Sequence, residues 1–177
     1  MIIELETLRL VRYSSQEYRA LKEELENGGS SSEYIHQIGE RLELSKDNDR
    51  SVFQSAFVVL DGNIPIGYLF ISSMMRDEVF LEYAVLKEFR GMGYASDMVM
   101  EVSNYLFQNY NIRSIRLDID PSNEKSILVA NSCGFVLDEE LFESRNFVGK
   151  MQFIKESDCY VSKRRTGSTR WKRKEYL

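Results

Sequence analysis

Residues 85 to 95, Val-Leu-Lys-Glu-Phe-Arg-Gly-Met-Gly-Tyr-Ala, contain a glycine turn that could bind a phosphate group. An apolar strand pattern precedes the turn, and a helical pattern follows it directly. Gly91 and Gly93 leave backbone N–H groups uncovered where the helix N-terminus adds its partial positive charge. Such turns bind anions through their N–H groups. The sequence therefore predicts a phosphate-containing ligand more directly than it predicts a substrate.

The glycine turn is expected to lie within a mixed sheet, because the elements follow the order β-α-α-β-β-β-α-β-α-β-β. Strands are predicted at residues 2–12 (one strand with a bulge at 6 and 7), 54–60, 64–72, 79–86, 113–119, 135–137 and 148–160. Helices are predicted at about 16–27 and 33–44, from about 91, and from 120–123 to 133.

Turn signals determine how these elements connect. Asp61-Gly62-Asn63 between two apolar runs predicts a hairpin. The strand-helix-strand order of residues 79–119 predicts that its two strands are parallel. Gly134 is suited to the left-handed position that ends a helix.

Length and composition indicate a single globular domain. The chain has 177 residues, of which 43% are hydrophobic and 29% charged. It has no apolar run of the ~20 residues that a membrane span needs, and its start does not resemble a signal peptide. Cys133 and Cys159 match no metal-ligand spacing and no secreted disulfide framework. We therefore expect a cytoplasmic protein with free thiols, no metal and no membrane partner.

The charge is unevenly distributed along the chain. The net charge is −5, but the seven basic residues and one acidic residue of 161–177 give that segment +6, which leaves −11 for residues 1–160. We therefore divide the chain into a domain, 1–160, and a basic tail, 161–177. An acidic domain attracts cationic ligands and repels nucleic acid, so any nucleic-acid contact is expected through the tail alone. A homodimer is compatible with these features.

The motifs together resemble the GNAT superfamily of acetyl-CoA-dependent N-acetyltransferases over roughly residues 2 to 160. Arg90, Gly93 and Ala95 fill its signature, and Asn123-Glu124-Lys125-Ser126 is followed at family spacing by Gly134-Phe135. The opening at 6–10 is similar to the branch that acetylates ribosomal-protein N-termini. The turn lacks the dinucleotide-binding and P-loop patterns. The resemblance implies an α/β (α+β) fold: a mostly antiparallel sheet of about seven strands, splayed at the fourth and fifth strands, with about four helices.

The resemblance also implies which residues bind acetyl-CoA. The pyrophosphate would lie over Arg90, Gly91, Met92, Gly93, Tyr94 and Ala95, bound mainly by backbone N–H groups. The pantetheine arm would pair with Ala84, Val85 and Leu86, and an N–H near Val85 or Leu86 would face the thioester oxygen. Asn123 would hydrogen-bond the pantetheine amide, while also being a helix N-cap candidate, and Ser126 would lie beside the cofactor.

The catalytic assignments follow from the chemistry of amide formation. The attacking amine must be neutral, and amines have pKa values of about 8 to 10, so a base is useful. Glu82 and Asp118 lie on the strands that flank the splay, and either could be the base. Many family members have a tyrosine acid where this chain has Ala130. Ser126 matches the position of an acid proposed in the ribosomal-protein branch. One of the ten tyrosines could also supply the proton.

Three functions follow from these residues. The first is transfer of an acetyl group from acetyl-CoA to a primary amine, either a small cationic molecule or a protein or peptide amine, by direct attack in a ternary complex. The second is a non-catalytic acyl-CoA-binding or regulatory module, which Ala130 motivates. The third is a nucleic-acid-associated acetyltransferase that uses its basic tail.

Overall fold

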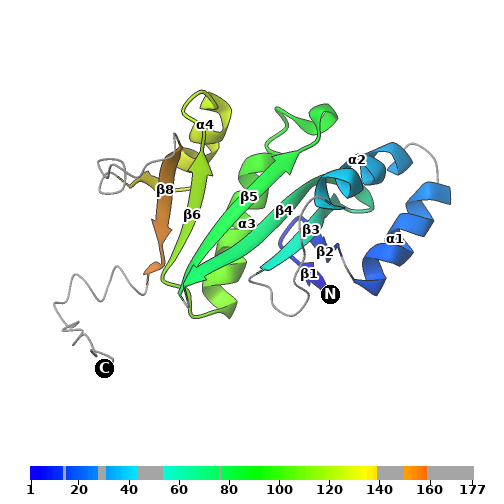
Figure 1. The fold of residues 1–177 in the computed structure, drawn as a ribbon, viewed down its shortest axis with the longest axis horizontal. Coiled ribbons are helices and arrows are strands. Elements are labelled where there is room, and N and C mark those ends of the chain that lie inside the picture. The colour runs from blue at the N-terminus through cyan, green and yellow to red at the C-terminus, as the bar shows by residue number, and fades with distance from the viewer. Residues whose placement is uncertain (14, 28–30, 44–53, 76, 139–149, 159–177) are drawn as a thin grey trace.

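The computed structural model describes residues 1–13, 15–27, 31–43, 54–75, 77–138 and 150–158. Within these residues one mixed sheet has the strand order β1-β2-β3-β4-β5-β6-β8-β7 (Figure 1). The strands are β1 (Ile2–Glu4), β2 (Arg9–Arg12), β3 (Gln54–Asp61), β4 (Ile64–Met75), β5 (Glu78–Val85), β6 (Ser114–Ile119), β7 (Val136–Leu137) and β8 (Met151–Glu156). The helices are α1 (Gln16–Asn27), α2 (Ser31–Glu43), the 3-10 turn η1 (Lys87–Phe89), α3 (Tyr94–Asn109) and α4 (Glu124–Ser132).

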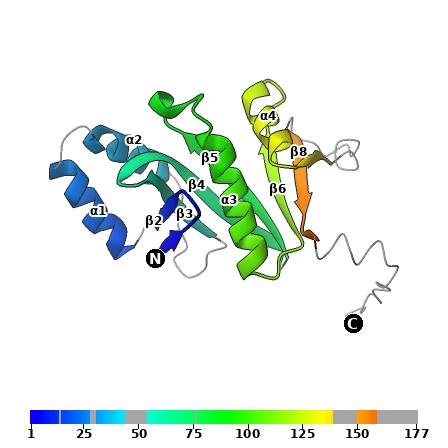
Figure 2. The ribbon, with the colours of Figure 1, turned by 180° about the vertical axis from the view of Figure 1, so that it is seen from behind.

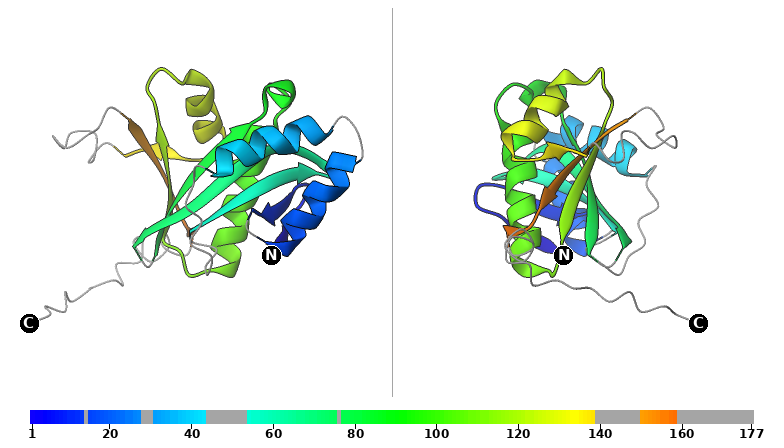
Figure 3. Two further views of the ribbon diagram at one scale, coloured as in Figure 1. Left: turned by 45° about the vertical axis from the view of Figure 1, so that its right-hand side comes forward. Right: turned by 90° about the vertical axis from the view of Figure 1, so that its left-hand side faces the viewer.

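Helices cover both faces of the sheet. Figure 2 shows α3 and α4 on one face, and Figure 3 shows α2 on the other. Each face has its own core because side chains alternate along a strand. Met98 and Val102 of α3 belong to one core, whereas Ile35 and Ile38 of α2 belong to the other, and all four are fully buried.

The first predicted strand is wrong in one respect, because residues 2–12 form a hairpin instead of one bulged strand. β1 pairs antiparallel with β2, and the Leu5 N–H donates to the Leu8 carbonyl in the turn. The Glu101 carboxylate of α3 accepts hydrogen bonds from the backbone N–H groups of Thr7 (3.0 Å) and Leu8 (3.3 Å). A side chain more than ninety positions away thus satisfies the turn, and the sheet gains a strand over the number expected.

The remaining predicted elements are confirmed to within a few residues, where the structure describes them. β3 and β4 form the expected hairpin, with Gly62 at φ 57° in its turn. β5 and β6 are parallel, as the crossover predicts, and Gly134 ends α4 at φ 80°. The last predicted strand contains β8, while its ends and the basic tail lie outside the described residues. No helix in the described ranges combines the length and apolar character that crossing a membrane requires.

Candidate active site

The sheet opens between β5 and β6. These strands pair only through residues 78–80 of β5 and 114–116 of β6, although β5 continues to Val85 and β6 to Ile119. Figure 1 shows the two strands diverging beyond this short ladder, with α4 at the open end of β6. The predicted splay is therefore present between β5 and β6, which correspond to the fourth and fifth strands predicted from the sequence.

A group of ion pairs holds the closed end of the splay together. Glu78 at the start of β5 pairs with Arg113 and with Arg116, whose Nε lies 3.6 Å from the carboxylate. Arg116 Nη1 also donates to Asp138 at 2.7 Å. Arg116, Glu78 and Asp138 are largely buried, so these charges are weakly screened. The ion pairs thus lie where the two strands meet, at the start of the opening.

The two edges of β5 differ in their hydrogen bonds. On the β4 side, pairing is continuous from Gly67 opposite Val85 to Met75 opposite Glu78, apart from one register shift. The Leu86 N–H then donates to the Ile66 carbonyl at 2.9 Å. Because successive N–H groups point to opposite edges of a strand, the Val85 N–H points to the opening.

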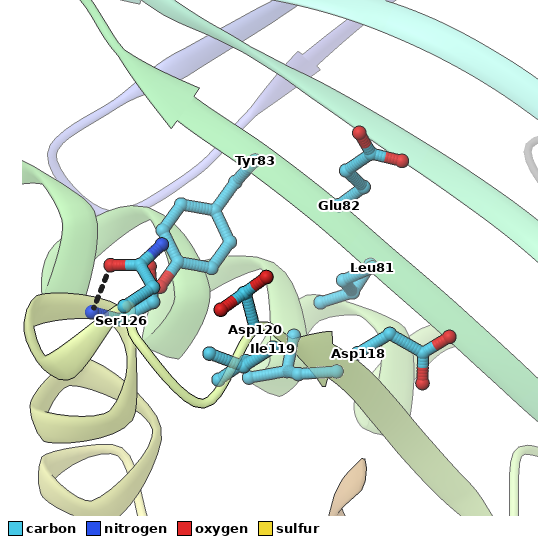
Figure 4. Close-up of a pocket in the computed structure, with 9 residues that line it drawn as sticks. Leu81, Glu82, Tyr83, Asp118, Ile119, Asp120 and Ser126 are labelled. Carbon is cyan, nitrogen blue, oxygen red and sulfur yellow. Dashed lines mark hydrogen bonds between the residues drawn. The ribbon is translucent and has the colours of Figure 1, made fainter. Parts of the chain in front are cut away.

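A pocket lies in this opening and brings several predicted residues together. It is lined by Leu81, Glu82, Tyr83, Leu117, Asp118, Ile119, Asp120, Asn123 and Ser126. Glu82 and Asp118 are both exposed and come from the two diverging strands. In Figure 4 their carboxylates point to one side of the pocket, while Tyr83 points to the other side, toward Ser126. The two base candidates thus share one side of the pocket.

Asn123 and Ser126 meet at the N-terminus of α4. Asn123 is the N-cap residue, and its Oδ1 accepts a hydrogen bond from the Ser126 N–H at 3.2 Å, the dashed line in Figure 4. The predicted capping role is therefore confirmed. Because the cap uses only the amide oxygen, the Nδ2 group of Asn123 can still donate to a ligand in the pocket.

The predicted phosphate-binding turn begins the long helix α3. Gly91 and Gly93 have φ values of 81° and 91°, a region that glycine adopts without the steric cost other residues meet. A Cβ on Gly91 would meet no protein atom within 4 Å, and one on Gly93 would meet only the Asp97 carboxylate at 3.7 Å. The space outside both glycines is thus open. The first N–H groups of α3 have no intrahelical acceptor and can bind an anion there.

Side chains around the turn fix its position. The Arg90 Nε donates to the Val85 carbonyl at 3.0 Å, so this side chain connects the turn to the end of β5. The Tyr94 hydroxyl donates to the Asp61 carboxylate at 2.6 Å, and that hydrogen bond raises the pKa of Tyr94. The ring of Phe89 in η1 contacts the rings of Tyr34 and Tyr94.

Tyr83 and Asp120 line the pocket but were not singled out from the sequence. The Tyr83 hydroxyl is buried and has no hydrogen-bond partner among the described residues. Burial raises the pKa of Tyr83, and the nearby Ser126 hydroxyl offsets part of that rise because it can donate toward the tyrosine oxygen, which still leaves the Tyr83 proton without an acceptor. Asp120 accepts hydrogen bonds from the N–H (2.8 Å) and hydroxyl (2.6 Å) of Ser122, which lower its pKa. Asp120 is thus a weaker base that holds the turn before α4. A signal for Tyr83 in the sequence is that it follows Glu82 on the same strand, so its side chain must point to the opposite face of the sheet.

Two residues of α4 and its end are buried as small core groups. Ala130, where many family members have a tyrosine, is fully buried in the core that includes α3. Cys133 is buried, and its thiol donates to the Ser96 carbonyl at 3.4 Å. Burial also raises the pKa of this thiol. Neither residue lines the pocket described above.

The comparisons with known proteins agree with this architecture. Residues 5–136 match the acetyltransferase (GNAT) domain family. The chain therefore belongs to the GNAT family of acetyltransferases, whose members use acetyl-CoA. This confirms the resemblance that the motifs at residues 90–95 and 123–135 indicated. A comparison with curated protein sequences gives no match.

Solved structures with the same fold include several acetyltransferases. A variant of the spermidine/spermine N-acetyltransferase SpeG from Vibrio cholerae is 19% identical, with a TM-score of 0.58 over 88% of this chain and 98% of that one. The ribosomal L7/L12 α-N-protein acetyltransferase RimL, solved with coenzyme A, is 16% identical, with a TM-score of 0.60 over 89% and 99%. A GNAT-family acetyltransferase from Bacillus anthracis is 15% identical, with a TM-score of 0.60 over 89% and 99%. At these identities the likeness establishes the fold.

Proposed function

We propose that this acetyltransferase transfers the acetyl group of acetyl-CoA to a primary amine, by direct attack within a ternary complex. The acceptor would be a small cationic molecule or the amine of a protein or peptide. The observation that carries the proposal is the pocket between β5 and β6, where two exposed carboxylates and the capped N-terminus of α4 meet in the opening of the sheet.

The donor would be bound by the glycine turn and the open edge of β5. Its pyrophosphate would accept hydrogen bonds from the N–H groups of residues 91 to 95, outside Gly91 and Gly93 where the space is open. Its pantetheine arm would enter the opening beside residues 84 to 86 and accept a hydrogen bond from Asn123 Nδ2. Arg90 would act by fixing the turn, since its Nε is bonded to Val85.

Of the two N–H groups expected near the thioester oxygen, we favour that of Val85. The Leu86 N–H already donates to Ile66, whereas the Val85 N–H points to the opening. Negative charge grows on the thioester oxygen as the amine attacks. A donor already aimed at it is worth about 3 kcal/mol in comparable sites, because no reorganisation is needed.

The carboxylates are suited to a cationic acceptor. An amine arrives mostly as an ammonium ion at neutral pH and must lose a proton before it attacks. Glu82 or Asp118 would accept this proton, directly or through water, on their shared side of the pocket. The charge of −11 on residues 1–160 would also favour the approach of a cation over that of an anion.

The test is a measurement of thiol release from acetyl-CoA with a panel of acceptors. The panel contains a polyamine, a lysine-like amine, a peptide with a free N-terminus, the same peptide with a blocked N-terminus, and a neutral alcohol. We expect turnover with at least one free amine, none with the blocked peptide or the alcohol, and a product heavier by one acetyl group. Turnover no faster than the protein-free rate with every amine would count against the proposal.

Calorimetry with coenzyme A separates this function from the alternative. A non-catalytic acyl-CoA-binding module would bind coenzyme A but release no thiol with any acceptor. Glu82→Gln and Asp118→Asn would then leave its behaviour unchanged. A protein that bound no coenzyme A would contradict both readings of the site.

A further inference from the structure

We propose that Tyr83 is the proton donor for the departing coenzyme A thiolate. This inference rests on the proposed acetyl transfer and assigns the acid that Ala130 leaves without its usual residue. The hydroxyl of Tyr83 enters the pocket from strand β5, whereas the tyrosine acid that the family resemblance implies would come from α4.

The geometry places Tyr83 opposite the base candidates. Glu82 and Tyr83 are adjacent on β5, so their side chains point to opposite faces of the sheet. Figure 4 shows the Tyr83 ring pointing toward Ser126 at the N-terminus of α4, while the Glu82 and Asp118 carboxylates point the other way. All four residues line one pocket. A proton can therefore be taken from the amine on one side and given to the sulfur on the other.

The Tyr83 hydroxyl has a donor proton and no acceptor for it. Among the buried side-chain polar atoms of the described residues, it is the only tyrosine oxygen without a hydrogen-bond partner. By contrast, the Tyr94 hydroxyl donates to Asp61. Buried hydroxyls normally have a partner, and one without it often marks a functional group. The thioester sulfur would supply that missing acceptor.

The position of Ala130 explains why the donor must come from elsewhere. Its side chain is fully buried in the core that includes Met98, Val102 and Phe135, so α4 presents no acid to the pocket from that position. Ser126 also lines the pocket and carries the other hydroxyl group that could donate a proton there. An aliphatic hydroxyl is also a much weaker acid than a phenol, which favours Tyr83 as the donor.

The proposed step balances as follows. The amine nitrogen bonds to the acetyl carbon, the carbon–sulfur bond breaks, and the electron pair of that bond goes to sulfur. The ammonium proton goes to Glu82 or Asp118, and the Tyr83 proton goes to the thiolate. A phenol is a weaker acid than a thiol, with pKa values of about 10 and 8.5, so this transfer is unfavourable by about thirtyfold, and it is completed when the phenolate takes a proton from the solvent at neutral pH. Burial raises the pKa of Tyr83, which keeps its hydroxyl protonated at neutral pH.

The experiment compares Tyr83→Phe with Tyr105→Phe, a matched variant on α3 away from the pocket. Both are titrated with coenzyme A and with desulfo-coenzyme A, which lacks the sulfur. We expect the wild type and Tyr105→Phe to prefer coenzyme A by about tenfold, and Tyr83→Phe to lose this preference. With the best acceptor of the panel, kcat of Tyr83→Phe should fall about 10²-fold, with little change in KM for acetyl-CoA.

Thermal unfolding of the ligand-free protein distinguishes this role from a structural one. Because the hydroxyl has no partner, Tyr83→Phe should melt at the same temperature as the wild type or at a higher one. A structural hydrogen bond would instead make the variant melt lower. A lower melting temperature together with an unchanged coenzyme A preference would overturn the proposal.

Ser126→Ala provides the second decisive comparison. If this variant loses kcat and the preference for the sulfur while Tyr83→Phe keeps both, Ser126 is the donor and the assignment to Tyr83 is wrong. If Tyr83→Phe behaves as the wild type in every measurement, the assignment is also wrong, but the proposed acetyl transfer stands. Only a wild type that neither binds coenzyme A nor releases thiol overturns both.

Discussion

The two edges of strand β5 differ in what their backbone groups contact. Toward β4, pairing runs along nearly the whole strand and ends with the Leu86 N–H on the Ile66 carbonyl. Toward β6, pairing stops after three residues, 78–80, and the strands diverge. One edge is thus part of an ordinary sheet, and the other presents backbone groups to a pocket.

Strand β5 can therefore be held in the sheet along one edge and bind a ligand along the other. The closed edge fixes the position of β5, because each ladder hydrogen bond restrains it. The open edge then offers donors that are already aimed and need no rearrangement when a ligand arrives, which is the main advantage of a preorganised site. Variants that act on one edge and spare the other test this division.

The largest effect is expected from the carboxylates beside the open edge. Glu82→Gln should lower kcat about 10²-fold or more if Glu82 is the base, and Asp118→Asn should do so if Asp118 is. Both side chains are exposed, so neither change should alter the melting temperature by more than a degree or two. Thiol-release kinetics and thermal unfolding measure the two quantities. Glu4→Gln, at an exposed position of β1, is the control.

Either carboxylate could be the base, so the pair of variants is informative whichever one responds. A loss in one variant alone assigns the base, and a partial loss in both indicates that they share a water molecule. Full activity in both variants would contradict the assignment of a base to this side of the pocket.

The next effect is expected at the closed edge, from Gly67→Ala. A Cβ on Gly67 would overlap the backbone carbonyl of Ala84, which cannot move without breaking the β4–β5 ladder. Overpacking of this kind costs about 3 kcal/mol of unfolding free energy when the backbone must shift. Urea denaturation measures the loss. Ser72→Ala, an exposed position of the same strand, should change stability little; equal losses in both would contradict this account.

A smaller effect is expected where the two strands still meet. Glu78→Gln removes the carboxylate that Arg113 and Arg116 share at the closed end of the splay. Arg116 keeps Asp138 and Arg113 is one-third exposed, so we expect a loss of about 1–2 kcal/mol. The splay should then begin earlier, and hydrogen exchange of the residue 114–116 amides should accelerate. Protection equal to that of the wild type would show that the ion pairs do not set this boundary.

Local patterns were sufficient to predict most of the fold. The hairpin at Asp61-Gly62-Asn63 and the glycine that ends α4 each depend on a few adjacent residues, and the parallel crossover depends on the order of three consecutive elements. All three are confirmed. The β1–β2 hairpin could not be predicted in this way. The Glu101 carboxylate accepts hydrogen bonds from the backbone N–H groups of the hairpin turn, and local sequence patterns do not indicate a partner so distant in the chain.

The site was predicted in part, for a similar reason. The glycine turn, Asn123 and the two carboxylates are recognisable from residue type and spacing. Tyr83 could not be told apart from the other nine tyrosines in the sequence, because its distinguishing property is a buried hydroxyl whose proton has no acceptor. That burial depends on the packing of α3 and α4 against β5.

A loss of stability smaller than that of Gly67→Ala is expected at two glycine turns, one on each side of the comparison. Gly93 begins the helix after the open edge, and Gly62 lies in the β3–β4 hairpin on the closed side. Both have positive φ, 91° and 57°, so an alanine at either costs about 1 kcal/mol. Neither new Cβ would meet a protein atom closer than 3.7 Å. The two variants should therefore lose similar stability.

Their affinities for coenzyme A should nevertheless differ. The methyl group of Gly93→Ala would occupy the space proposed for the pyrophosphate, so its Kd should rise at least tenfold. Gly62→Ala adds its methyl group where it would meet no protein atom within 4 Å and leaves the neighbouring Asp61–Tyr94 hydrogen bond in place, so it should bind as the wild type does. Calorimetric titration of both, normalised to the folded fraction, measures the difference. Equal Kd values would mean that the phosphates do not lie over this turn, since the two substitutions are matched in chemistry and strain and differ only in position.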